Sequence, residues 1–158
     1  MALVLKPGMV GTGAISSPSV FLVGSIEMGI AENWQERIER EFSNEELTFF
    51  NPRRDDWDSS WSQTGEQFNT QVNWELNALD DSDIIFMYFS PETKSPISLL
   101  ELGLYADSHK MIVVCPDGFW RKGNVSVVCT RNNIPMFNTI EEGIFALRTS
   151  VRKNQKLY

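Results

Sequence analysis

The sequence predicts a doubly wound α/β fold, in which a five-stranded parallel sheet is covered by helices on both faces. Short segments rich in Val, Ile, Phe and Met alternate along the chain with amphipathic segments, an alternation typical of parallel sheets. The strand segments are continuous apolar runs, as expected for strands buried on both faces. With 158 residues, of which 42% are hydrophobic and 22% charged, the chain suits one packed domain.

Five apolar segments are predicted as strands. Each is short, contains β-branched or aromatic residues and is bounded by Gly, Pro, Asn or Ser, which is the usual pattern of a buried strand. The five are Ser19–Gly24, Glu46–Phe50, Asp83–Phe89, Met111–Cys115 and Ile134–Phe137. Asp83–Phe89 is the most strongly apolar of them.

Helical spacing marks the segments between and after these strands. The helices expected are residues 30–42, 65–81, 95–108 and 139–149, with a shorter one inside 116–133. In the first of them, apolar side chains recur every four residues among charged ones. Ser95 and Pro96 suit the N-cap and first turn of the third, and Thr139 with Glu142 forms a capping box for the last.

Residues 1–18 are rich in Gly, Ser and Pro without periodicity, and we expect a flexible N-terminal tail before a domain spanning 19–158. Five strands in this order predict a flavodoxin- or Rossmann-like sheet, in which ligands bind beyond the carboxyl ends of the strands. That rule selects four segments for chemistry. They are Gly24–Gly29, Asn51–Trp61, Ser90–Glu101 and Pro116–Asn124.

Composition excludes several classes of function. The formal charge of −7 argues against a nucleic-acid surface, although it permits uncharged nucleosides. Two cysteines and a single histidine provide no metal-ligand cluster, so we expect neither a metal site nor a disulfide framework, and no cofactor. No stretch is apolar enough for a signal or membrane segment, which predicts a cytoplasmic protein without membrane contact.

Two carboxylates are candidates for catalysis. Glu101 stands among leucines at the start of a helix on the ligand edge, and a carboxylate is costly to bury there without a partner. Glu75 lies on the helix that precedes the strongest strand. Each has an ordinary alternative as a solvated helix acid, and spacing alone does not decide between the two. Converging on one pocket, they would suit glycosidic chemistry, in which one attacks the anomeric carbon and the other handles a proton.

Four further residues are candidates for ligand binding. Asp55 and Trp57 lie in a polar segment, where tryptophan can stack on a planar base and aspartate can accept from its N–H groups; the alternative is that the tryptophan covers the loop locally. Gly24 and Ser25 end the first predicted strand, and their backbone N–H groups could hold a ribose hydroxyl or a phosphate.

These segments resemble the nucleoside 2-deoxyribosyltransferase family, and especially its divergent 2-deoxyribosyltransferase-like branch. The resemblance spans roughly residues 19–140 and rests on several motifs in the family's order. The motifs are Phe21–Ser25, Asn51–Asp55, Trp74-Glu75, Ser82–Ile85, Ser95–Gly103 with its Glu-Leu-Gly, and Gly123-Asn124.

The resemblance implies roles for individual residues. Glu101 matches the family's nucleophilic glutamate, which forms a covalent deoxyribosyl intermediate, and Glu75 falls where the family has an Asp near the base or sugar. Ser95 falls where the transferases carry an acid and related nucleotide hydrolases carry a phosphate-binding serine. Asn124 matches an Asn that contacts the 5′-hydroxyl, often across a subunit interface, and Asp55 lies in the base-recognition region. Family members assemble as oligomers, so a homo-oligomer is expected.

Departures from the family pattern keep three functions open. Phe21 stands where the family has a tyrosine whose hydroxyl orients the nucleophile; Tyr88 and Tyr105 are replacements only by proximity in sequence. Transfer of deoxyribose from a nucleoside to a free nucleobase is the preferred hypothesis. The alternatives are hydrolysis of a nucleoside 5′-monophosphate, which Ser25 and Ser95 would favour, and nucleoside or nucleotide binding without turnover.

Overall fold

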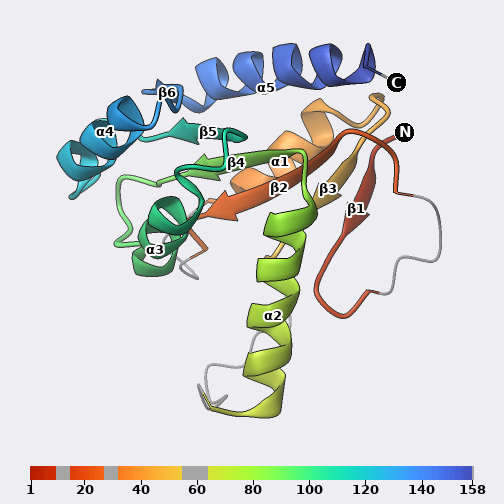
Figure 1. Cartoon of the computed structure of the whole chain (residues 1–158), viewed down its shortest axis with the longest axis horizontal. Helices are drawn as coiled ribbons and strands as arrows, with labels where there is room; N and C mark the ends of the chain where they lie inside the picture. Colours follow the sequence, from red (N-terminus) through yellow and green to blue (C-terminus); the bar gives the residue numbers. More distant parts are fainter. Residues whose placement is uncertain (10–14, 27–31, 55–63, 158) are drawn as a thin grey trace.

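The computed structural model describes residues 1–9, 15–26, 32–54 and 64–157. Within them, one parallel sheet has the strand order β1-β3-β2-β4-β5-β6 (Figure 1). The strands are β1 (Leu3–Leu5), β2 (Ser19–Gly24), β3 (Thr48–Phe50), β4 (Ile84–Tyr88), β5 (Met111–Val114) and β6 (Met136–Phe137). The doubly wound α/β prediction is confirmed, and each of the five expected strands is present. Strand β2 has the expected bounds, and the other four are slightly shorter than expected.

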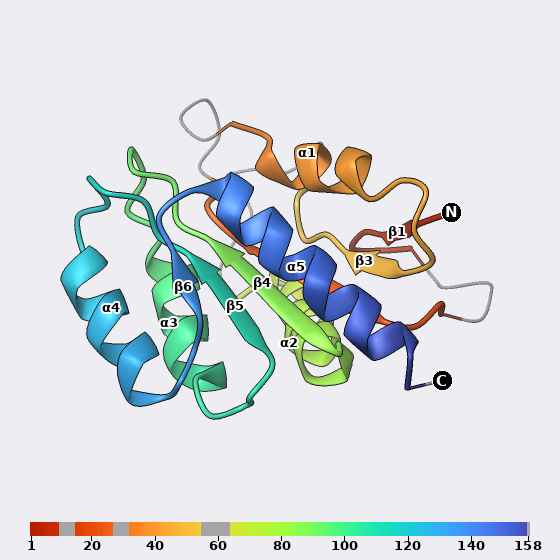
Figure 2. The same ribbon diagram turned by 90° about the horizontal axis from the view of Figure 1, so that it is seen from above.

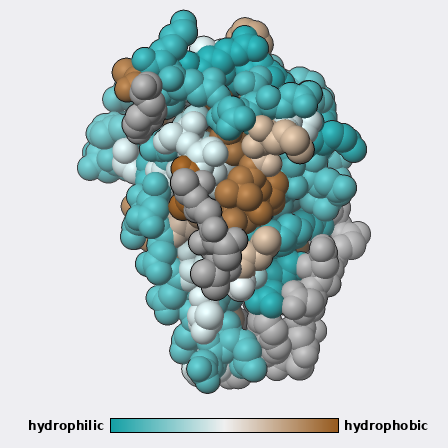
Figure 3. Space-filling view, turned by 90° about the vertical axis from the view of Figure 1, so that its right-hand side faces the viewer, coloured by the Kyte–Doolittle hydropathy of each residue, from teal (hydrophilic) through white to brown (hydrophobic). Residues whose placement is uncertain are grey.

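The sheet has six strands rather than five, because part of the expected N-terminal tail is ordered. Leu3–Leu5 pairs in register with Thr48–Phe50 as edge strand β1, and the Asn51 N–H donates to the Leu5 carbonyl at 2.9 Å. A three-residue segment is too short to show periodicity; it is β3, with an otherwise unpaired edge, that makes it a strand. Figure 3 shows this side of the molecule, where an apolar patch lies within a largely hydrophilic surface.

In the described part of the chain, five helices cover the two faces of the sheet, as Figures 1 and 2 show. They are α1 (Trp34–Glu41), α2 (Glu66–Asp81), α3 (Pro96–Tyr105), α4 (Lys122–Arg131) and α5 (Ile140–Gln155). Helices α1 and α5 pack on one face, and α2, α3 and α4 pack on the other. The last helix continues to Gln155 instead of ending near residue 149, and Thr139 caps it by accepting from the Glu142 N–H, as predicted. Among the described residues, none of the helices combines the length and apolar character needed to cross a bilayer.

Alternate side chains of each central strand enter two separate cores. Phe21, Ile85 and Val113 face α2, α3 and α4, whereas Val20, Phe86 and Val114 face α1 and α5. All six residues are fully buried, with an exposed fraction of 0% each. This two-sided burial explains why the strands read as unbroken apolar runs.

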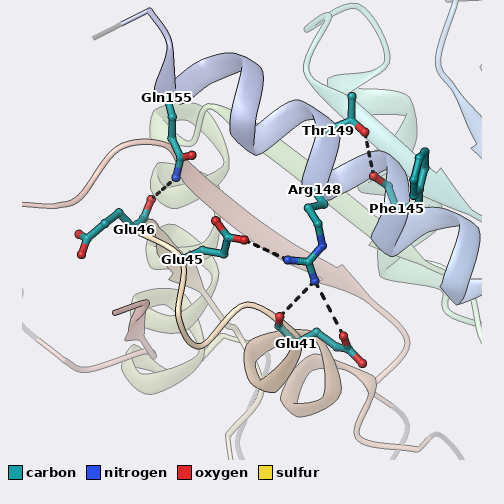
Figure 4. Close-up of polar contacts among 7 residues, drawn as sticks. All are labelled: Glu41, Glu45, Glu46, Phe145, Arg148, Thr149 and Gln155. Atoms are coloured by element: carbon teal, nitrogen blue, oxygen red, sulfur yellow. Dashed lines mark hydrogen bonds and ion pairs between the residues drawn. The ribbon is translucent and has the colours of Figure 1, made fainter.

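Polar contacts fasten the outer helices. Arg148 of α5 donates to the Glu45 carboxylate at 3.0 Å and to the Glu41 carbonyl at 3.2 Å (Figure 4). Its guanidinium also lies over the Phe42 ring. Lys110 caps the C-terminal end of α2: its ammonium group donates to the backbone carbonyls of Leu79, Asp80 and Ser82. Both contacts join segments that are distant in sequence.

The strand order reverses between β2 and β4, and this places the ligand edge. Chain connections leave β2 toward α1 on one face and β4 toward α3 on the other. Gly24 pairs with Tyr88 at this point, at a φ of +148°, and an added Cβ would lie 2.1 Å from the Tyr88 carbonyl oxygen. Glycine is therefore required for β2 to end this close to β4.

Candidate active site

Glu101 lies in the second turn of α3, on the helix face that packs toward α2. Pro96 starts this helix immediately after the loop that follows β4, so the position of Glu101 is fixed by the carboxyl end of β4. The side chain is buried, with only 8% of the residue exposed. Among the described residues, no group donates a hydrogen bond to its carboxyl. The two influences on its ionisation are burial and the nearby charge of Glu75. The alternative of a solvated helix acid is thereby excluded.

Glu75 reaches the same region from α2. It is half-buried, and its Oε1 accepts a hydrogen bond of 2.7 Å from Nε2 of Gln71, one turn earlier. Burial raises the Glu75 pKa above its ordinary value, and the Gln71 hydrogen bond opposes that rise by stabilising the ionised form. The structure thus brings together the two carboxylates that the sequence singled out.

The two acids influence each other's ionisation. The pKa of Glu101 is raised to about 8, first by burial and then by repulsion from Glu75. The repulsion is mutual, so the titration belongs to the pair. Burial and repulsion from Glu75 both favour the protonated form of Glu101 near neutral pH, and no hydrogen-bond donor among the described residues opposes them.

Aromatic rings line the sheet beside the acid pair. The Trp74 ring centroid lies 6.3 Å from that of Phe21 and 6.2 Å from that of Phe50. Phe21 is fully buried and offers no hydroxyl group. Neither tyrosine considered as a replacement donates to Glu101: the Tyr105 hydroxyl donates to Asp80 at 2.8 Å, and Tyr88 packs in the core on the opposite face of the sheet.

Ser25 and Ser95 belong to a buried cluster of hydroxyl groups with Thr93. The three oxygens lie 2.7–2.8 Å from one another, and Thr93 also donates to the Ser90 carbonyl at 3.0 Å. The hydroxyl hydrogens are shared among these contacts, and the cluster fastens the loop after β4 to the end of β2. Binding a phosphate, which needs hydrogen-bond donors, would require the cluster to rearrange.

The structure contradicts one expectation about local backbone roles and bears out another only in part. The Ser25 N–H donates to the Tyr88 carbonyl at 3.0 Å, so it is not available for a ribose hydroxyl or a phosphate. Ser95 occupies the N-cap position of α3, but it has left-handed backbone angles and makes no side-chain cap. Its hydroxyl turns back to Ser25 instead. In both cases the group makes a tertiary contact with the neighbouring strand or loop.

Asn124 lies on the exposed side of α4. It lines a cavity of about 310 Å³ between α3 and α4, together with Leu99, Gly103 and Trp120. Neither this cavity nor the second one described, of about 450 Å³ near Glu32, Tyr88 and Glu141, has Glu101 or Glu75 in its wall. The structure therefore does not group Asn124 with the acid pair around one cavity.

Gln71 and Arg54 are neighbours of the acid pair that sequence reasoning missed. Gln71 is buried, with 4% of the residue exposed, and its Oε1 accepts from Nη1 of Arg54 at 3.3 Å. The four-residue spacing between Gln71 and Glu75 on one helix was the signal that could have identified it. The predicted base-recognition residues Asp55 and Trp57 lie outside the described residues.

A comparison with protein families identifies the family of this chain. The family model described as "Nucleoside 2-deoxyribosyltransferase like" matches residues 17–119, which is more than half of the chain. The match begins just before β2 and includes both Glu75 and Glu101, whereas Asn124 lies beyond it. A search of curated proteins found no match. The chain therefore belongs to the nucleoside 2-deoxyribosyltransferase-like family.

Proposed function

We propose that this protein cleaves the N-glycosidic bond of a (deoxy)nucleoside through a covalent Glu101–sugar intermediate and transfers the sugar to an acceptor nucleobase. The observation that carries the proposal is a buried carboxyl at the ligand edge that has no hydrogen-bond donor among the described residues and stands beside a second acid. Such a group is costly to keep unless it reacts. Membership of the family makes a nucleoside the natural substrate.

The chemistry needs one ionised acid and one protonated acid, and the pair holds a single proton. When that proton passes from Glu101 to Glu75, the Glu101 carboxylate is freed to attack C1′ of the sugar. The C1′–N bond breaks as the new C1′–O bond forms, and Glu75 gives its proton to the departing base.

The second half of the reaction reverses these steps. A nitrogen of the acceptor base attacks C1′, the ester bond to Glu101 breaks, and Glu75 takes the proton that the acceptor releases. Two displacements at C1′ return the original anomeric configuration. No cofactor is needed at any step.

The test is to incubate the protein with each 2′-deoxynucleoside, with and without a different free base, and to separate the products by chromatography. We expect a new nucleoside only when both are present, and a Glu101-bound deoxyribosyl group in acid-quenched protein by mass spectrometry. Glu101→Gln should lower turnover at least about a thousandfold, as loss of a nucleophile does, whereas Glu66→Gln at an exposed position on α2 should not. Turnover retained by Glu101→Gln would contradict the mechanism.

The same experiment separates the two alternatives. Free base released without an acceptor would identify a hydrolase, and a nucleoside 5′-monophosphate should then be included as substrate. The hydroxyl groups of Ser25, Thr93 and Ser95 contact one another, so they would have to give up some of these contacts to bind a phosphate. Nucleoside binding without any product would identify a non-catalytic protein.

We also propose that the protein acts as a homo-oligomer in the cytosol. Ile97, Leu100 and Leu104 form an apolar stripe along α3, with exposed fractions of 61%, 67% and 62%. A stripe of this kind suits helix–helix packing, and the family resemblance implies an assembly. Light scattering of the purified protein should give a mass above that of one chain, and Leu100→Glu should reduce it. A monomeric wild-type protein would exclude the assembly.

A further inference from the structure

Gln71 connects the acid pair to the segment that follows β3. Its Nε2 donates to Oε1 of Glu75 at 2.7 Å and approaches the Pro52 carbonyl at 3.5 Å. Its Oε1 accepts from Nη1 of Arg54 at 3.3 Å. The side chain is almost completely buried, so these contacts are made with little competition from water.

Arg54 determines which end of the Gln71 amide faces Glu75. A guanidinium has only N–H donors, so the amide oxygen must face Arg54. The amide NH₂ group is then left facing Glu75. The reverse orientation would place the amide oxygen against the Glu75 carboxylate and the NH₂ group against the guanidinium, leaving two repulsive contacts in a buried site. The donor presented to Glu75 is therefore fixed by a residue outside the acid pair.

We propose that Gln71 is a positioning residue that makes Glu75 the ionised member of the acid pair and leaves the resting proton on Glu101. This inference rests on the proposed function and deepens it, because it explains how two buried carboxylates in one site start the reaction in different protonation states. The hydrogen bond from Gln71 favours the charged form of Glu75, and Glu101 has no equivalent donor among the described residues.

Other charged and titratable groups around Glu75 do not replace this effect. Glu101 of α3 repels a charge on Glu75. Tyr105, also on α3, donates to Asp80 rather than to either glutamate. Arg54 donates to the amide oxygen of Gln71, which lies next to Glu75. Among the described residues, Gln71 is the group that hydrogen-bonds to Glu75.

The experiment measures carboxyl titration directly, so it does not depend on turnover. Glutamate side-chain carboxyl carbons are labelled with ¹³C in the ligand-free protein, and Glu75 and Glu101 are assigned with Glu75→Gln and Glu101→Gln. In Gln71→Met, which has a side chain of similar length without a donor, we expect the Glu75 pKa to rise by about one unit or more. Gln71→Glu keeps an acceptor for Arg54 and should also raise the Glu75 pKa. This second variant replaces Gln71→Met in the experiment if the methionine variant does not fold.

The matched control is Asn73→Met on the same helix. Asn73 is exposed, and its amide donates to the Asn69 carbonyl within α2, so its removal should leave both titrations unchanged. If transfer activity is present, the acid limb of its pH profile should move upward with the Glu75 titration in Gln71→Met and stay in place in Asn73→Met. A folded Gln71→Met protein with an unchanged Glu75 titration would overturn the inference. Absence of turnover in the wild-type protein would instead overturn the proposed function, and the titration would still decide the role of Gln71.

Discussion

Replacing Glu101 by glutamine should make the protein more stable, and the gain should grow with pH. Folding raises the Glu101 pKa from 4.5 to about 8, so between these values the native state holds a proton that the unfolded chain has released. The unfolding free energy of the wild-type protein therefore falls as pH rises through this range. Glutamine has nearly the same shape but does not ionise, so the unfolding free energy of Glu101→Gln should not fall with pH for this reason.

The size of the effect follows from the same shift. A difference of one pKa unit corresponds to about 1.4 kcal/mol, so the full shift sets an upper limit of about 4–5 kcal/mol above pH 8. Glu75 shares the titration and the site can relax around a charge, which lowers the net cost. We expect the stability difference between Glu101→Gln and wild type to increase by about 2–4 kcal/mol from pH 5 to pH 8.

The assay is urea unfolding followed by circular dichroism at pH 5, 6, 7 and 8. Glu66→Gln serves as the control, since this exposed acid lies on α2 away from the pair; its stability difference should stay within about 0.5 kcal/mol across the series. A Glu101→Gln difference that is equally flat would refute the reasoning, because it would mean that Glu101 ionises in the folded protein as easily as in the unfolded chain. A gain in stability together with lost turnover is the expected exchange at an active site.

Three further substitutions test the fold that positions the site. Gly24→Ala should destabilise the protein by at least about 3 kcal/mol in urea unfolding, because the new Cβ would lie 2.1 Å from the Tyr88 carbonyl oxygen; a loss below about 1 kcal/mol would show that the strand end adapts freely. Lys110→Met should cost about 1–2 kcal/mol, since three carbonyls at the end of α2 lose their donor, and an unchanged melting temperature would contradict this. Arg148→Met should cost about 1 kcal/mol, with a smaller loss in 1 M NaCl than in low salt if the ion pair with Glu45 contributes.

Local sequence patterns were enough to predict most strands and helices. The strands β2 to β6 are apolar runs because their side chains enter cores on both sides of the sheet, and α3 begins at Pro96 as its sequence indicates. The prediction that Glu101 is a functional carboxylate also came from the sequence, because its neighbours at the start of the helix are mostly apolar. The structure shows that this carboxylate is buried, with 8% of the residue exposed.

Tertiary contacts decided what the side chains at the site do. Leu3–Leu5 is a strand only because β3 offers an unpaired edge. Ser95 follows a predicted N-cap pattern, yet its hydroxyl bonds to Ser25, seventy positions away in the chain. The orientation of the Gln71 amide depends on Arg54 from another segment.

The sequence by itself determined the fold class, the positions of most elements and the two candidate carboxylates, because hydrophobic periodicity and capping act over a few neighbouring residues. Only the tertiary structure decided that Glu101 is buried near enough to Glu75 for their charges to interact, and that Gln71 donates to Glu75. Ionisation in a protein interior depends on burial and on the donors and charges within a few ångströms. Those neighbours come from helices and loops that are far apart along the chain.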